Sequence, residues 1–184
     1  MAANGESKSN RVYHNNFINN TNQTYLFKSF NNTWDGGYPS GGNYWNDNAH
    51  VDLYSGLYQN KNGSDGISDV FYDIDMNNKD RFALMATINA FNVGTWNGET
   101  SAIEIVSNST VSDFQLDASQ KMVGLNVSGD TGFGFCRVII PNVIVQGLWQ
   151  HNYTIFINGQ PVEFRDWTNT VHTYTSYIPI YDKR

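Results

Sequence analysis

The stretch between residues 47 and 80 holds seven aspartates and only two lysines. The acids are Asp47, Asp52, Asp65, Asp69, Asp73, Asp75 and Asp80. Calcium prefers roughly six to eight oxygen ligands, drawn from carboxylates, amides and backbone carbonyls at turns. Residues 62–69, NGSDGISD, offer all three kinds. If Gly66 turns sharply, Asp65 and Asp69 converge with the Ile67 carbonyl between them, which predicts a calcium site.

The same segment also has a simpler interpretation without a metal. It approximates the D-x-[DN]-x-[DN]-G pattern of calcium loops but lacks the terminal glutamate, so it is not an EF-hand. Asp-Gly turns are common in proteins that bind no ion. Transition metals are disfavoured, because the four histidines are scattered and there is no cysteine pair.

Composition excludes several classes of protein. A formal net charge of −6 argues against a nucleic-acid partner, which requires a basic face. The single cysteine, Cys136, cannot form an internal disulfide and is expected to be a small buried hydrophobe. No apolar run is long enough to predict a membrane span. The first residues lack the apolar region of a signal peptide, and residues 1–9 are interpreted as a flexible leader.

Residues 86–184 are predicted to form an antiparallel β-sandwich of immunoglobulin-like type. Helical periodicity is hard to find anywhere, so the fold class is all-β. Strands are expected at 82–90, 101–107, 111–117, 121–128, 133–140, 152–158, 161–165 and 171–180. Asn158-Gly159 has the residues that a type I′ hairpin turn requires.

Residues 10–85 are predicted to form a β-helix-like coil followed by a long glycine- and aspartate-rich loop that calcium stabilises. Short apolar pairs alternate there with asparagine pairs, as in one coil of a parallel β-helix. One coil alone is unstable, since about three repeats are needed for a solenoid core. The chain is therefore either the tail of a longer solenoid, or these strands form an irregular hairpin that caps the sandwich.

The segments NRVYHNNFINNTNQTY, YPSGGNYWNDNAHVDLYSG, GSDGISDVFYDID and DRFALM together resemble archaeal secreted NosD-like right-handed β-helix surface proteins. The following residues resemble the β-sandwich that often closes such proteins. The resemblance implies an exported surface protein with acidic positions at Asp52, Asp65, Asp69 and Asp75. The expected metal set is these four carboxylates with Ile67. Ser64 is an insertion relative to the family loop, and Ser68 replaces a glycine.

Seven N-x-[ST] sequons agree with export to a surface that carries N-glycans. They begin at Asn19, Asn22, Asn31, Asn62, Asn108, Asn126 and Asn152. Asn62 could not easily be both glycosylated and a metal ligand. The other six are the expected attachment sites.

Three functions follow from these patterns. The favoured one is a non-catalytic, calcium-stabilised structural or adhesive module of an extracellular surface, able to pair with itself through an exposed strand edge. The first alternative is a carbohydrate-binding module, in which Trp34, Tyr38, Tyr44 and Trp45 stack on surface glycans. The competing interpretation of that set is that these rings form the core of their own loop. The second alternative is a remnant of a polysaccharide-active β-helix enzyme, although no nucleophile motif is present.

Overall fold

The computed structural model describes residues 7–129 and 134–177. Strands make up 46% of the structure and helices 5%, which confirms the all-β class. The chain divides into two compact units, Met1–Ile88 (unit 1) and Asn89–Arg184 (unit 2). Each unit has its own core, and each is described by itself.

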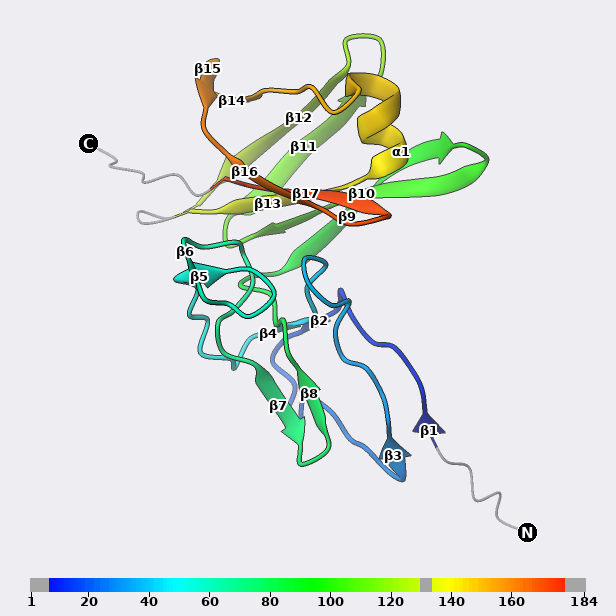
Figure 1. Cartoon of the computed structure of the whole chain (residues 1–184), viewed down its shortest axis with the longest axis vertical. Coiled ribbons are helices and arrows are strands. Elements are labelled where there is room, and N and C mark those ends of the chain that lie inside the picture. The colour runs from blue at the N-terminus through cyan, green and yellow to red at the C-terminus, as the bar shows by residue number, and fades with distance from the viewer. Residues whose placement is uncertain (1–6, 130–133, 178–184) are drawn as a thin grey trace. The chain divides into compact units, whose positions relative to one another are not determined.

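Unit 1 is built on short parallel strands that lie one coil apart in the sequence (Figure 1). Strand β1 (Ser7–Lys8) pairs with β3 (Ser29–Phe30), and β2 (Asn16–Phe17) pairs with β4 (Tyr44–Trp45). Further parallel bridges join Arg11 to Thr33 and Tyr44 to Leu84. Three segments therefore lie side by side. The first segment is residues 10–17, the second is residues 33–45, and the third is residue 84.

Left-handed corners keep these strands short. Ser9, His14 and Asn19 have φ values of 60°, 59° and 53°, and they lie five residues apart. A residue with positive φ leaves the β region, so each corner ends one extended stretch and turns the chain toward the next. Asparagine and histidine tolerate this conformation better than β-branched residues, which suits Asn19 and His14 to these positions.

The rest of unit 1 consists of two antiparallel pairs and a small aromatic core. Strands β5 (Tyr54–Ser55) and β6 (Lys61–Asn62) form one pair, and β7 (Tyr72–Asp75) and β8 (Asn78–Asp80) form the other. Figure 1 shows the β7–β8 hairpin extending away from β5 and β6. The core centres on Trp34, Trp45 and Ala83.

Unit 2 contains a five-stranded sheet in the order β16-β17-β13-β10-β9. Its strands are β9 (Ile88–Trp96), β10 (Glu99–Ser107), β13 (Cys136–Pro141), β16 (Arg165–Thr168) and β17 (His172–Tyr177). Strand β13 is antiparallel to both β10 and β17. Two antiparallel pairs accompany the sheet, β11 (Thr110–Asp117) with β12 (Met122–Ser128), and β14 (Ile155–Ile157) with β15 (Gln160–Val162).

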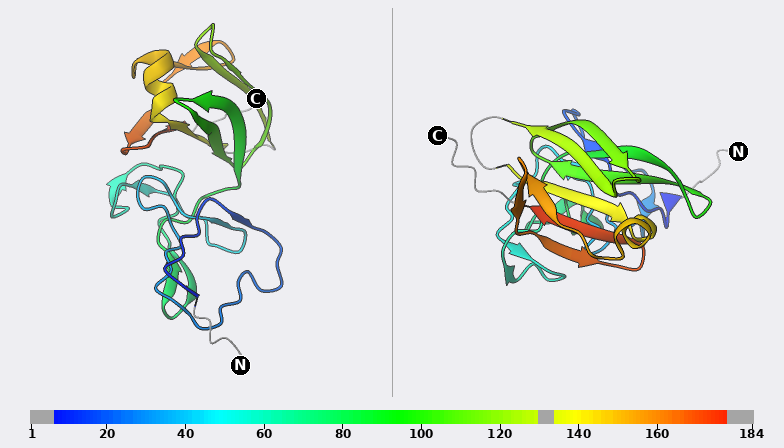
Figure 2. Two further views of the ribbon diagram at one scale, coloured as in Figure 1. Left: turned by 90° about the vertical axis from the view of Figure 1, so that its right-hand side faces the viewer. Right: turned by 90° about the horizontal axis from the view of Figure 1, so that it is seen from above.

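A hydrophobic cluster holds the layers of unit 2 together. Ile103 and Ile140 come from the sheet, and Phe114 from β11 packs against the same cluster. The helical turn α1 (Asn142–Ile144) and the π-helix η1 (Val145–Trp149) add further buried side chains to it. Figure 2 shows the β11–β12 pair as a layer separate from the sheet. In the part of the chain that the structure describes, no helix is long and apolar enough to cross a membrane.

Candidate functional site

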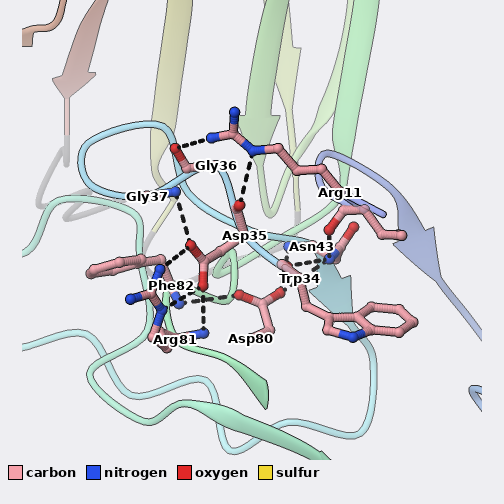
Figure 3. Close-up of polar contacts among 10 residues, drawn as sticks. Arg11, Trp34, Asp35, Gly36, Gly37, Asn43, Asp80, Arg81 and Phe82 are labelled. Atoms are coloured by element: carbon pink, nitrogen blue, oxygen red, sulfur yellow. Dashed lines mark hydrogen bonds and ion pairs between the residues drawn. The ribbon is translucent and has the colours of Figure 1, made fainter. Parts of the chain in front are cut away.

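A buried polar cluster connects the three parallel segments of unit 1 (Figure 3). Asp80 is fully buried, and its Oδ2 atom accepts the backbone N–H of Asn43 at 2.6 Å and the indole N–H of Trp45 at 2.9 Å. Its Oδ1 atom accepts the backbone N–H of Phe82 at 3.1 Å. Burial raises the pKa of Asp80 to about 6, although these hydrogen bonds act in the opposite direction.

Asp35 forms the second acidic position of this cluster. It is 1% exposed, and Arg81 holds it with two hydrogen bonds, from Nε to Oδ2 at 2.9 Å and from Nη2 to Oδ1 at 2.8 Å. The same carboxylate accepts the N–H of Gly37, which closes the tight turn at Gly36-Gly37. The hydrogen bond to Asp35 raises the pKa of Arg81. Such a bidentate, charge-assisted pair fixes geometry, and here it ties the glycine turn to the end of β8.

Close approach explains the glycines of YPSGGNYW. A Cβ atom on Gly42 would collide with the Asp80 carboxylate, and one on Gly41 would meet the Leu84 side chain. Gly41 also has a φ of 94°. Glycine is therefore required where the second segment passes over the buried acid.

Asparagine pairs link the first and second segments. Asn10 donates its backbone N–H and its Nδ2 atom to Asn32 Oδ1. Asn15 donates the same two groups to Asn43 Oδ1, at 3.1 and 3.0 Å. A third pair joins Asn19 and Asn46 in both directions. Asn10 and Asn15 directly follow the left-handed corners at Ser9 and His14, and Asn19 is itself a corner. An asparagine at or directly after each corner is the one sequence signal for these pairs.

Asp52 organises the predicted calcium loop from one side. Its Oδ1 and Oδ2 atoms accept the backbone N–H groups of Asp65 and Gly66 at 3.1 and 2.7 Å. Burial is the largest cause that raises the pKa of Asp52, to about 7, and repulsion from Asp65 and Asp69 adds to it. These three predicted carboxylates therefore interact electrostatically with one another.

The other predicted metal ligands lie in two separate places. Asp65 is fully buried and accepts the N–H of Ile67 at 3.1 Å, while Asp69 accepts the N–H of Leu53 at 2.7 Å. Asp75 instead lies on the β7–β8 hairpin, where it accepts from Asn77 and Asn78. Among residues 7–129 and 134–177, no group of three or more His, Cys, Asp or Glu side chains is arranged as a metal site.

The donor chemistry nevertheless fits a hard cation at Asp52, Asp65 and Asp69. All three are oxygen ligands, and a carboxylate has about four lone-pair sites, so the backbone N–H bonds leave further acceptor capacity. The mutual repulsion of neighbouring acids is the kind of unfavourable energy that a divalent cation removes. Asp75 does not share this location and does not belong to that set.

The four aromatic residues proposed for sugar stacking do not form an exposed plane. Trp34 and Trp45 are 6% and 0% exposed. Trp45 lies stacked between Phe17, at a ring separation of 4.0 Å, and Tyr72, at 4.2 Å. Tyr38 and Tyr44 are half-buried. Neither indole presents a face to solvent, and both belong to the core of unit 1.

All six expected glycan-bearing asparagines are exposed: Asn19, Asn22, Asn31, Asn108, Asn126 and Asn152. The amide nitrogen of Asn126 is held by Asp113 at 2.7 Å. The Asn108 side chain accepts the N–H of Phe135 at 3.0 Å.

Comparisons with protein-family models, curated proteins and solved structures find no match to this chain. Functional arguments therefore rest on the geometry of the two units.

Proposed function

We propose that the chain is a non-catalytic structural module of an extracellular, archaeal cell surface, and that it pairs with a second copy of itself through the open edge of unit 1. In this proposal residues 10–85 are a β-helix-like coil region of NosD-like type. Unit 2 is then an immunoglobulin-like sandwich that closes it. The observation that carries the proposal is the ladder of parallel segments joined by asparagine pairs one coil apart.

The first segment has a free edge within the described residues. Strands β1 and β2 each have one partner strand there, β3 and β4. The backbone N–H groups of Val12 and His14 bond to Thr33 and Gly42 of the second segment. Successive amides alternate in direction along an extended chain, so the N–H of Tyr13 faces the other side. An unpaired edge of this kind is a template for β-pairing with another chain.

Calcium is the proposed cofactor, held at Asp52, Asp65 and Asp69. When bound, the ion would supply the positive charge that keeps these buried carboxylates ionised together. The residues themselves shape the loop, because each carboxylate accepts backbone N–H groups from the opposite strand or turn. Metal binding is thereby proposed to stabilise unit 1 rather than to perform chemistry.

A structural role is favoured over catalysis by what the buried acids contact. Asp35 and Asp80 are saturated by Arg81, by the Trp45 indole and by backbone N–H groups, so they hold segments together. The exposed sequons support an extracellular setting in which glycans cover the surface. The carbohydrate alternative through Trp34 and Trp45 has no such support, since both rings are buried.

The proposal is tested by measuring mass against concentration by analytical ultracentrifugation for the wild type, Tyr13→Pro and Tyr13→Ala. Proline removes the outward N–H, whereas alanine removes the ring and keeps that donor. We expect reversible dimers for the wild type and Tyr13→Ala, and weaker association for Tyr13→Pro. Circular dichroism and thermal unfolding verify that the proline variant is folded. A wild type that stays monomeric up to several hundred micromolar would eliminate self-pairing.

A further inference from the structure

A depression of about 390 Å³ opens on the surface of unit 1, and none of the residues used above for pairing lines it. It is lined by Leu57, Tyr58, Gln59, Asp69, Phe71, Arg81 and Phe82. The lining comes from the turn between β5 and β6, from the stretch before β7, and from the residues after β8. We propose that this depression binds a neutral saccharide.

One residue that lines the depression, Gln59, carries an unsatisfied hydrogen-bond acceptor. The amide nitrogen of Gln59 donates to the Gly56 carbonyl at 3.0 Å and to Asp65 Oδ2 at 3.3 Å. If the Gln59 amide were turned by 180°, its oxygen would face the Gly56 carbonyl and Asp65 Oδ2, which are both acceptors. These two contacts therefore fix which side of the amide carries the nitrogen. Gln59 Oε1 is consequently buried with no hydrogen-bond partner among the residues that the structure describes. A buried acceptor without a donor costs free energy, so the Gln59 side chain gains by turning Oε1 outward to a ligand hydroxyl in the depression.

Arg81 supplies donors that are already held in position. Its guanidinium has five N–H groups, and Asp35 accepts only from Nε and Nη2. Figure 3 shows the guanidinium against Asp35 and beside Phe82. Because the side chain is 58% exposed, its remaining donors are open to a ligand at little further entropic cost.

Aromatic rings provide the apolar part of the site. Tyr58 is 80% exposed, and Phe71 is 48% exposed with the Lys79 ammonium 4.3 Å from its ring centre. A sugar presents C–H groups on one ring face and hydroxyls around its edge. That combination suits an exposed aromatic ring beside separate donors and acceptors.

The charges around the depression select a neutral ligand. Arg81 is compensated by Asp35, and Lys79, whose ammonium lies over the Phe71 ring, is paired with Asp73 at 3.6 Å. Without a bound cation, Asp69 contributes a further negative charge. The negative charge of a phosphate or uronate would be repelled by Asp69. It would find no uncompensated positive charge on Arg81. A purely apolar ligand would leave Gln59 Oε1 unsatisfied. A neutral saccharide avoids both penalties.

The test is saturation-transfer NMR on the full chain at roughly 10 mM sugar, about ten times a weak dissociation constant of 1 mM. The probes are maltotriose, cellotriose, mannotriose and N,N′,N″-triacetylchitotriose, with digalacturonate as the anionic comparison. We expect at least one neutral probe to bind, and Tyr58→Ala to weaken it about tenfold or more. Tyr58→Phe should retain binding, because it keeps the ring.

Tyr25→Ala is the matched control, since Tyr25 is 87% exposed in the same unit and does not line the depression. Tyr58 is itself exposed, so its replacement should leave thermal unfolding unchanged. The proposal is overturned if no neutral probe binds, if digalacturonate binds equally well, or if Tyr58→Ala and Tyr25→Ala have the same effect. Self-association of the chain is measured separately, so either proposal can fail without the other.

Discussion

Asn43 and Asp80 form the central contact of unit 1, although 37 residues separate them. The Asn43 backbone N–H donates to Asp80 Oδ2 at 2.6 Å, and its amide nitrogen reaches the carbonyls of Val12 and Trp34 at 3.0 and 2.8 Å. Its amide oxygen accepts from Asn15. One asparagine thereby joins the first segment, the second segment and the end of β8.

Replacing Asn43 by alanine should lower the free energy of unfolding of unit 1 by about 2–4 kcal/mol. The side chain is fully buried, and its loss removes the donor to the Val12 and Trp34 carbonyls and the acceptor of the Asn15 backbone N–H. Chemical denaturation monitored by tryptophan fluorescence measures the loss. Asn60→Ala, at an exposed position of the same unit, should change it little. Equal effects of the two substitutions would contradict the central role of Asn43.

Gly42→Ala should also destabilise the chain, by about 1–3 kcal/mol or more. The added Cβ would overlap the Asp80 carboxylate, which cannot move without losing its bonds to Asn43 and Trp45. Gly124→Ala is the comparison, because no other atom lies within 4 Å of the position that its Cβ would occupy. Thermal unfolding should show a lower midpoint for the first variant only. A Gly42→Ala protein as stable as wild type would show that Asp80 has room to shift.

Some features of the fold are predictable because local residues decide them. Asn158 and Gly159 have φ values of 50° and 76° between β14 and β15, as the predicted type I′ turn requires. The alternation in residues 121–128 predicts β12 almost to the residue. Residues 82–87 are expected in a strand, but β9 begins at Ile88. The helical segment at 142–149 is not predicted, since its apolar residues alone do not distinguish helix from strand.

The arrangement of the site is less predictable from the sequence, because contacts between residues far apart in the chain decide where its side chains lie. The sequence places Asp52, Asp65 and Asp69 in one acidic loop, and the pKa of Asp52 reflects that proximity. Spacing cannot reveal that Asp75 turns away on the β7–β8 hairpin, where Asn77 and Asn78 hold it. Likewise, nothing local to NKDRF indicates that Arg81 pairs with Asp35 across 46 residues. Burial of Trp34 and Trp45 depends on the same distant pairing.

His50 should make unit 1 sensitive to mild acid. Its ring is half-buried and stacks on Tyr44 at 5.3 Å. Burial lowers the pKa of His50, while Asp47 acts in the opposite direction. The unfolded state binds a proton near pH 6.5 and the folded state only at lower pH, so stability falls as pH drops below that value. NMR titration of the His50 ring measures the shift, and His50→Phe should remove this part of the pH dependence.

The half-buried Asp52 and the fully buried Asp80 should give the opposite pH dependence without metal. Their folded pKa values, about 7 and about 6, lie above the unfolded value of 3.8. The folded state therefore binds more protons in that window, and stability decreases as pH rises from about 4 to about 7. Unfolding measured in EDTA across this range should show a flatter profile for Asp52→Asn than for wild type. An Asp52→Asn profile that matches the wild-type profile would show that Asp52 is ionised in the folded state without penalty.

Calcium should reverse the loss that ionisation of Asp52 causes at pH 7 and above. An ion that binds only the folded state stabilises it by mass action, by about 4 kcal/mol at a thousandfold excess over the dissociation constant. The thermal midpoint should rise with calcium and fall with EDTA. It should respond weakly to magnesium, because magnesium requires a near-ideal octahedral set of ligands that a flexible loop does not provide. Asp69→Asn should abolish the calcium response, because Asp69 belongs to the interacting acids. Asp75→Asn should preserve it, since Asp75 lies on the β7–β8 hairpin, and equal responses from both variants would place the ion elsewhere.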